Sequence, residues 1–184
     1  VLDRTAFYAE SGGQSADGGT IEGKKLRNVI KVEGVVLHEM ENPDFKPGQS
    51  VSGKVDLKRR KAITANHTAA HLLNAAAREV LGRHVWQGGS HKEVEKAHLD
   101  LTHYKRITQE ELNLLEKKVN AWIMEEIPIS IEILSRNIAE EKYGFVLYQG
   151  GAVPGKELRI AKIGDVDVQA CGGTHHMLSN TGEI

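Results

Sequence analysis

The chain has 184 residues, 40% of them hydrophobic, which is enough for a real core at the border between one domain and two. Its 24 Lys and Arg balance 25 Asp and Glu, which excludes a globally basic nucleic-acid-binding protein, so any RNA contact must come from local patches. The single cysteine excludes an internal disulfide framework and favours a reducing, cytoplasmic setting. No run approaches the roughly 18 apolar residues of a membrane span.

Both ends of the sequence fall where a strand could continue. The start, Val1-Leu2-Asp3-Arg4, has no targeting signal and resembles a strand entered halfway. The chain stops at Thr181-Gly182-Glu183-Ile184, where another strand could begin. We therefore expect a piece of a larger protein.

Residues 1–58 consist of short apolar stretches separated by glycines, which is typical of small antiparallel strands and tight turns. Residues 28–36 read NVIKVEGVV and are rich in strand formers. Residues 51–57 read VSGKVDL and alternate apolar with polar residues, as a half-buried strand does. The sequence predicts a glycine-rich, β-barrel-like subdomain over 1–58, or a small β-sandwich.

From residue 59 the pattern becomes helical. Residues 59–81 contain no glycine, many alanines and apolar residues at helical spacing, and Gly82 ends the predicted helix. A loop through Gly88-Gly89 is expected next, and then a strand over 97–103.

The rest of the chain mixes helices and strands. Thr108 and Glu111 form a capping box that opens a helix to about Glu126, and Pro128 closes it. The further expected elements are a strand over 129–133, a short helix over 135–143, and strands over 158–163 and 166–170. The predicted fold class is α+β, with a two-layer α+β domain over 59–184.

A metal site is suggested by two histidines on the long helix. His67 and His71 in HTAAH are four positions apart, which places both imidazoles on one helix face within about one turn. Isolated helical histidines are usually ordinary core or surface groups, so the pair needs support. HTAAH also lacks the glutamate of HExxH, which argues against a metallopeptidase.

The support comes from the end of the chain. Cys171, the only cysteine, and His175 offer a thiolate and an imidazole across a glycine turn that can fold tightly around a metal. With the helical pair they complete a tetrahedral set for Zn²⁺. His176 is a rival fourth ligand, but it would point the opposite way in an extended segment, so we predict His175.

Basic residues gather just before the zinc helix. Charge runs are usually only solvated faces, yet phosphate contacts are plausible here. We assign RNA binding to Arg59, Arg60 and Lys61; Lys54 and Lys58 flank them, and Lys156, Arg159 and Lys162 form a second group.

Four segments together carry a family resemblance: LDRTAFYAESGGQ, HTAAHLLNAAAREVLG, HVWQGGS and CGGTHH. With them the chain resembles the editing domain of alanyl-tRNA synthetase and its freestanding relatives, the AlaX trans-editing proteins. The two zinc motifs are also similar to those of the threonyl-tRNA synthetase editing domain. The resemblance spans nearly the whole chain.

The resemblance implies an ester hydrolase. Such a deacylase removes serine or glycine from the acceptor end of tRNA(Ala), because a synthetic pocket made for alanine cannot fully exclude glycine or serine. It also implies a larger ATP-binding alanine–tRNA ligase, whose remaining parts would be this chain's partners.

Carried over position by position, the four predicted ligands match the family's zinc ligands. Gln87 in HVWQGGS matches a polar position beside the bound aminoacyl group, and Gln14 in SGGQ belongs to its glycine-rich motif, so both are candidate catalytic residues. Without the family, Gln87 would be read as an exposed loop amide and Gly12-Gly13 as a hairpin turn. Thr174 is left out, since a hydroxyl in a tight turn more often satisfies local backbone.

Two questions stay open at this point. Four protein ligands fill a tetrahedral zinc, so the metal either activates water after weakening one ligand or only positions the substrate. The chain could also be a freestanding AlaX-type deacylase, or a nonenzymatic RNA-binding module with a structural zinc.

Overall fold

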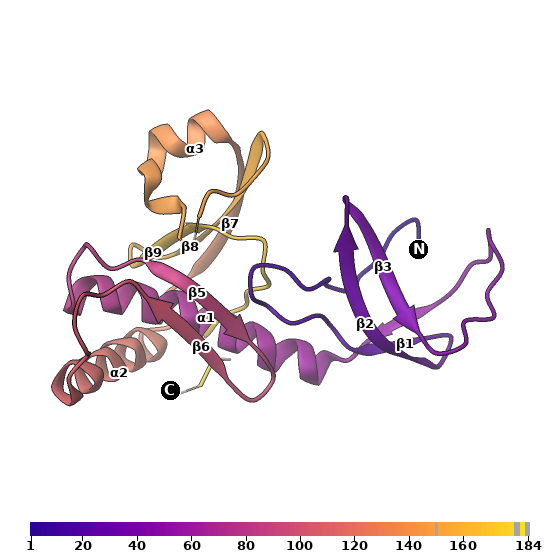
Figure 1. Ribbon diagram of the computed structural model, residues 1–184, viewed down its shortest axis with the longest axis horizontal. Helices are drawn as coiled ribbons and strands as arrows, with labels where there is room; N and C mark the ends of the chain where they lie inside the picture. Colours follow the sequence, from indigo (N-terminus) through magenta and orange to yellow (C-terminus); the bar gives the residue numbers. More distant parts are fainter. Residues whose placement is uncertain (150, 179–180, 183–184) are drawn as a thin grey trace.

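The computed structural model describes residues 1–149, 151–178 and 181–182, and its elements alternate between sheets and helices along the chain (Figure 1). In chain order they are β1 (Gly19–Ile21), β2 (Lys24–Val32), β3 (Val35–Met40), β4 (Gly53–Val55), α1 (Leu57–Val80), β5 (Gln87–Lys92), β6 (Ala97–Leu101), α2 (Gln109–Met124), β7 (Ile129–Ser135), α3 (Arg136–Tyr143), the 3₁₀ helix η1 (Gly144–Leu147), β8 (Glu157–Ile163) and β9 (Asp167–Ala170).

The N-terminal strands form an open antiparallel sheet in the order β3-β2-β1-β4. The predicted barrel-like closure is therefore wrong. A closed barrel needs hydrogen-bonded pairing between its outermost strands. Here the outermost strands β3 and β4 lie at opposite edges of the sheet, and β1 and β4 have only three residues each. The sheet has its own apolar cluster, which includes Phe7, Leu26 and Val29.

Helix α1 spans 24 residues and confirms the predicted long helix with slightly earlier bounds. Its N-cap is Asp56, whose carboxylate accepts a hydrogen bond from the backbone N–H of Arg59. Gly82 follows its C-terminus at a φ of 116°, a conformation that favours glycine. Although α1 begins at the predicted border, the division into domains 1–58 and 59–184 stays a prediction.

The segment predicted as a loop through Gly88-Gly89 is instead strand β5, paired antiparallel with β6. Glycine-rich sequence carries no alternation of side chains, so only the partner strand reveals it as a strand. The register shifts between Gln87 and Gly89, which makes a bulge at the start of β5. Bulges turn the side chains beside them, and here the bulge is next to Gln87.

The α+β character of the rest is confirmed. Helix α2 has the predicted capping box of Thr108 and Glu111, with both reciprocal bonds formed. It packs on α1 through an apolar cluster that includes Leu72, Val119 and Trp122. Strands β7, β8 and β9 form an antiparallel sheet in chain order, and α3 lies beside it (Figure 1).

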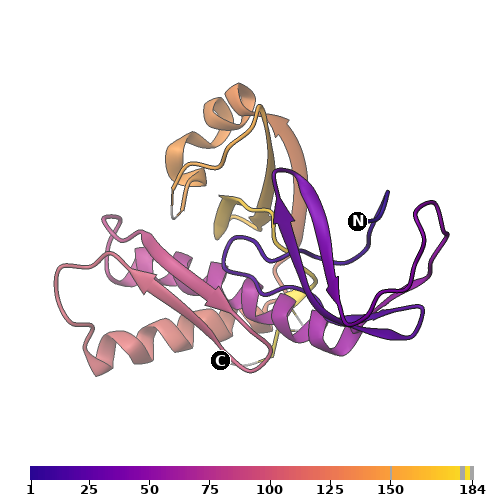
Figure 2. The ribbon, with the colours of Figure 1, turned by 45° about the vertical axis from the view of Figure 1, so that its right-hand side comes forward.

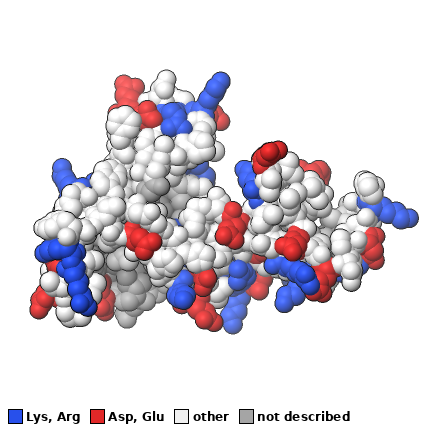
Figure 3. Space-filling model, in the orientation of Figure 1, with Lys and Arg blue, Asp and Glu red and all other residues white. Residues whose placement is uncertain are grey.

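The N-terminal sheet lies at one end of the long axis, and α1 leads from it to the other elements (Figures 1 and 2). Two contacts join the N-terminal segment to the rest of the chain: Arg60 of α1 forms an ion pair with the buried Asp17, and Gln14 forms a parallel bridge with Lys92 of β5. Acidic and basic side chains are interspersed on the face shown in Figure 3. Within the described ranges, no helix combines the length and the apolarity that crossing a membrane requires.

Candidate metal centre

The structure brings the four predicted ligands together. One donor atom from each of His67, His71, Cys171 and His175 lies within 4.8 Å of all the others. The Sγ atom of Cys171 is 3.2 Å from Nε2 of His67 and 3.5 Å from Nε2 of His175. The donor atoms of a tetrahedral zinc with ordinary bond lengths are about 3.3 to 3.6 Å apart, so the two sulfur–nitrogen distances are close to those around such an ion.

Two elements distant in sequence supply the cluster. The histidines of α1 are 3% and 4% exposed, because they face the loop that follows β9. Cys171 begins this loop, and its backbone N–H donates to the carbonyl of Arg159 on β8. Gly173 then passes against His67 so closely that a Cβ atom would come within 2.1 Å of the imidazole. Only glycine allows the chain to return the fourth ligand to the cluster.

Each of the three imidazoles uses Nδ1 for a bond to the protein. Nδ1 of His67 is 2.7 Å from Oε1 of Gln14, and Nδ1 of His71 is 2.8 Å from Oδ2 of Asp167. Nδ1 of His175 is 3.2 Å from Oγ1 of Thr68, whose own proton goes to the carbonyl of Thr64, so that hydroxyl accepts from His175. In each case the proton lies on Nδ1 and Nε2 is left for a metal, which is the usual outer contact of zinc-binding histidines.

Among the residues that bond Nδ1 of the three imidazoles, Gln14 has hydrogen bonds to both His67 and Thr174. It is 1% exposed, and its Oε1 accepts from His67 and also from the backbone N–H of Thr174 at 2.9 Å. Its Nε2 donates to Oγ1 of Thr174, which in turn lies 2.6 Å from Oγ1 of Thr64. The structure thus places Gln14 behind a predicted metal ligand. Its assignment as a catalytic residue stays a prediction, and the geometry favours a positioning role.

The glycines before Gln14 form the tight hairpin turn that their sequence suggested. Gly12 and Gly13 have φ values of 57° and 72°, and the flanking backbones of Ser11 and Gln14 pair across the turn. A Cβ atom on Gly13 would lie 2.0 Å from the carbonyl oxygen of Ser90 on β5. This turn can therefore seat Gln14 against His67 only with glycine at that position.

The thiol of Cys171 is prepared to act as a thiolate. Burial opposes ionisation, but the imidazoles of His175, His67 and His71 around the sulfur outweigh it and lower the pKa of Cys171 to about 2. The backbone N–H of Gly173 also donates to the sulfur at 3.3 Å. A half-buried thiolate facing three imidazole nitrogens has the donor chemistry that zinc prefers, so the residues fit the metal.

His176, the rival ligand, lies outside the cluster. Its Nδ1 is 3.1 Å from the carbonyl of Met177 and its Nε2 is 3.3 Å from the carbonyl of Lys61. The structure therefore places the two adjacent histidines in different surroundings, and His175 alone of the two joins the cluster.

Gln87, the other predicted catalytic residue, begins β5 beside the bulge. It is half-buried, and its Nε2 donates to Oγ of Ser90 at 3.2 Å. The same hydroxyl accepts from the ammonium of Lys92 at 2.5 Å, and Lys92 also donates to the carbonyl of Gly12. Gln87 is thus connected through Ser90 and Lys92 to the turn that carries Gln14. Its role toward a substrate stays a prediction.

Sequence reasoning missed two polar residues of this region. Lys92 is 3% exposed and lies near enough to Cys171 for their charges to interact, although burial lowers the pKa of its ammonium. Asp167 was read only as part of a strand, yet it holds His71. Lysine and aspartate are usually exposed, and neither Lys92 nor Asp167 has a local sequence signal of burial, so only the fold reveals them.

The predicted RNA-binding residues differ in how far they are engaged within the protein. Arg60 pairs with Asp17 and donates to the carbonyl of Ala6, and Arg59 donates to the carbonyl of Ala16. Lys61 is exposed. Their contact with RNA stays a prediction, and Lys61 is the best placed of the three.

Comparison with known proteins first defines a class. Residues 1–59 match the family described as tRNA synthetases class II (A), and residues 158–184 match the threonyl and alanyl tRNA synthetase second additional domain. The second match includes Cys171 and His175. The chain thus carries sequence typical of aminoacyl-tRNA synthetases.

Relatives that match over the whole of this chain narrow the class. The whole chain is 47% identical to the alanine–tRNA ligase of Methanothrix thermoacetophila, 48% to that of Methanopyrus kandleri and 49% to that of Methanococcus aeolicus. It spans about a fifth of the length of these curated relatives, with 20% of each covered. The chain is therefore homologous to a segment of alanine–tRNA ligase, and the resemblance seen in its motifs is confirmed.

Proposed function

We propose that this chain is the editing part of an alanyl-tRNA synthetase, a zinc-dependent deacylase that releases serine or glycine wrongly attached to tRNA(Ala). The carrying observation is the His67–His71–Cys171–His175 cluster, in which every imidazole is oriented through Nδ1 by an outer partner. Homology with alanine–tRNA ligase supplies the substrate class.

The reaction adds water across the ester that joins the amino acid to the terminal ribose. The water oxygen bonds to the carbonyl carbon, the bond from that carbon to the ribose oxygen breaks, and the ribose oxygen takes up a proton. Zinc bound in the cluster would supply either a Lewis acid for the carbonyl or a fixed charge that orients the amino acid.

The protein's own groups would orient the reactants. Gln87 presents an amide beside the bulge of β5, where it can hold the attacking water or the amino acid. The hydroxyls of Thr64 and Thr174, which bond each other at 2.6 Å near His67, would recognise the serine side chain by exchanging that bond for one to its hydroxyl. Gln14 is hydrogen-bonded to both His67 and Thr174, so it would hold the imidazole and the Thr174 hydroxyl in a fixed relative position.

The test is multiple-turnover release of amino acid from mischarged tRNA(Ala). We expect fast release of serine and much slower release of alanine, because a site with polar groups placed for a hydroxyl loses those contacts when the hydroxyl is missing. Removing zinc with a chelator should abolish release and adding zinc should restore it. An RNA-binding module with a structural zinc would bind the tRNA without any release, which would refute the proposal.

A freestanding deacylase and a synthetase segment would share this reaction. The full-chain similarity to alanine–tRNA ligases, together with the class II match over residues 1–59, favours the synthetase. The remainder of that enzyme and the tRNA acceptor end are the partners that follow.

A further inference from the structure

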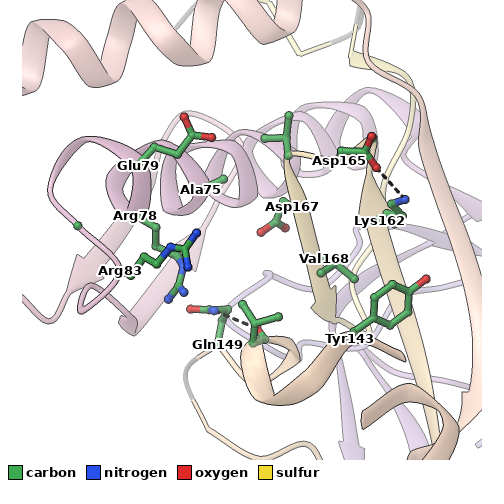
Figure 4. A pocket seen from close by; sticks show the side chains of 14 residues that line it. Ala75, Arg78, Glu79, Arg83, Tyr143, Gln149, Lys162, Asp165, Asp167 and Val168 are labelled. Carbon is green, nitrogen blue, oxygen red and sulfur yellow. Dashed lines mark hydrogen bonds and ion pairs between the residues drawn. The ribbon is translucent and has the colours of Figure 1, made fainter. Parts of the chain in front are cut away.

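A cavity lies beside the metal cluster. A cavity of about 730 Å³ opens between the C-terminal half of α1, the turn that joins β8 to β9, and the segment around η1 (Figure 4). Small-molecule sites typically have volumes of roughly 300–1,000 Å³. Asp167 lines this cavity and also holds His71, so the cavity and the cluster share a wall.

The acidic side chains of the cavity are already paired. Glu79 forms an ion pair with Lys118, and Asp165 pairs with Lys162. Asp167 pairs with His71 and also accepts from Gln169. These carboxylates therefore offer little charge to a cationic ligand.

Two arginines at and just after the C-terminal end of α1 are much less engaged. Arg78 donates to the carbonyl of Val85 and lies over the ring of Trp86, so it has a partly structural explanation. Arg83 is exposed and, across the described part of the chain, makes no hydrogen bond or ion pair. Figure 4 shows both guanidinium groups pointing toward Gln149. Two converging guanidinium groups without a protein anion form a site for a phosphate.

Gln149 adds a second recognition element. Its Nε2 donates to the carbonyl of Val146 at 3.0 Å, whereas its Oε1 is buried and lacks a hydrogen-bond partner among the described residues. A buried amide oxygen without a donor is costly. A turn of the Gln149 side chain would present this oxygen to a ribose hydroxyl or a base N–H in the cavity. Free cations and an unpaired acceptor in one cavity match a nucleotide.

The place of the cavity indicates which nucleotide. At one side it borders Asp167, the outer partner of His71, and at the other Arg78 contacts Trp86, the residue before Gln87. We infer that the cavity binds a phosphate-bearing nucleotide of the RNA acceptor strand next to the aminoacyl end, with Arg83 and Arg78 on the phosphate. This assignment rests on the proposed function, since that function brings the acceptor end to the cluster.

Arg83→Glu is the clean test, because Arg83 has no partner whose loss would disturb the fold. Arg4→Glu is its matched control: Arg4 is also exposed, and it lies near the N-terminus, beside a different pocket. The probe is an RNA hairpin that has a single-stranded 3′ end and carries no amino acid. Its Kd is measured by fluorescence anisotropy at several salt concentrations. We expect Arg83→Glu to bind the hairpin at least tenfold more weakly. The slope of its log affinity against log salt concentration should be smaller by about 0.7 to 0.9 per lost phosphate contact. Arg4→Glu should change little in either quantity.

A phosphate-free ester separates this inference from the proposed function. Arg83→Glu should hydrolyse 3′-O-seryl adenosine at the wild-type rate while losing rate on seryl-tRNA. Unchanged RNA affinity in Arg83→Glu, or an equal loss in Arg4→Glu, would overturn the assignment. Displacement of the hairpin by free AMP at equal concentration would assign the cavity to free nucleotides instead, and so would also overturn it. If no variant hydrolyses either ester, the proposed function fails, yet the hairpin affinities still decide the cavity.

Discussion

The imidazole of His67 and the side-chain amide of Gln14 are joined by a 2.7 Å hydrogen bond, although 53 positions separate them in the chain. The amide oxygen of Gln14 accepts a hydrogen bond from Nδ1, and Nε2 on the other side of the ring faces Sγ of Cys171. One glutamine in the N-terminal segment therefore sets the orientation of a predicted metal ligand on α1. This contact and the cluster around it lead to four predictions.

Cys171→Ala should lower zinc content and abolish deacylation of seryl-tRNA(Ala), because it removes the only thiolate among the four donors. The apolar core between α1 and α2 does not include Cys171, so most of the helical circular-dichroism signal should remain. Metal analysis and single-turnover rates measure the two effects. Wild-type activity at reduced zinc would show that the metal is dispensable.

The adjacent histidines provide a matched pair of substitutions. His175→Ala should lose zinc, whereas His176→Ala should keep it, because only His175 lies in the cluster. Zinc per chain after dialysis against a weak chelator gives the answer. Equal retention in both variants, or loss in His176→Ala alone, would exclude the proposed ligand set.

Gln14→Leu should weaken zinc binding by about 10- to 100-fold without removing a ligand, because His67 loses the acceptor that fixes its orientation. It also leaves the N–H of Thr174 unpaired, at a cost of about 1–3 kcal/mol in the free energy of unfolding. Competition with a chelator and denaturant unfolding measure the two quantities. Gln109→Leu, at an exposed site on α2, is the control and should change neither. Undiminished zinc affinity in Gln14→Leu would argue for a direct role toward substrate.

Gln87→Ala should retain zinc and change the deacylation rate or the serine-to-alanine preference by on the order of tenfold or more. Gln87 bonds Ser90 rather than a ligand of the cluster, so the metal has no reason to leave. Zinc analysis beside rates on seryl- and alanyl-tRNA(Ala) tests both halves. With wild-type rate and preference, Gln87 would be a bystander, and the polar contact would have to be sought at Gln14 or Thr174.

Local sequence rules predicted the elements that depend on near neighbours. The capping box of Thr108 and Glu111 acts within one turn, and the alanine-rich helix follows from its own spacing. Local rules failed where the structure depends on pairing between strands. The glycine-rich β5 forms a strand by pairing with β6. The N-terminal sheet stays open, with β3 and β4 at its two edges. These outcomes depend on partners far away in the chain, which local patterns do not contain.

The candidate site divides in the same way. The sequence by itself determined the donors: the four-residue spacing of His67 and His71 places them on one helix face whatever surrounds them, and the glycine turn lets Cys171 and His175 approach each other. The outer contacts were decided only by the tertiary structure, because Gln14 meets Thr174 across 160 positions and Asp167 meets His71 across 96. The cavity of Arg83 likewise exists only where α1 meets the β8–β9 turn. Donor chemistry belongs to residue types and local geometry, whereas orientation and enclosure belong to surfaces that meet only when the chain folds.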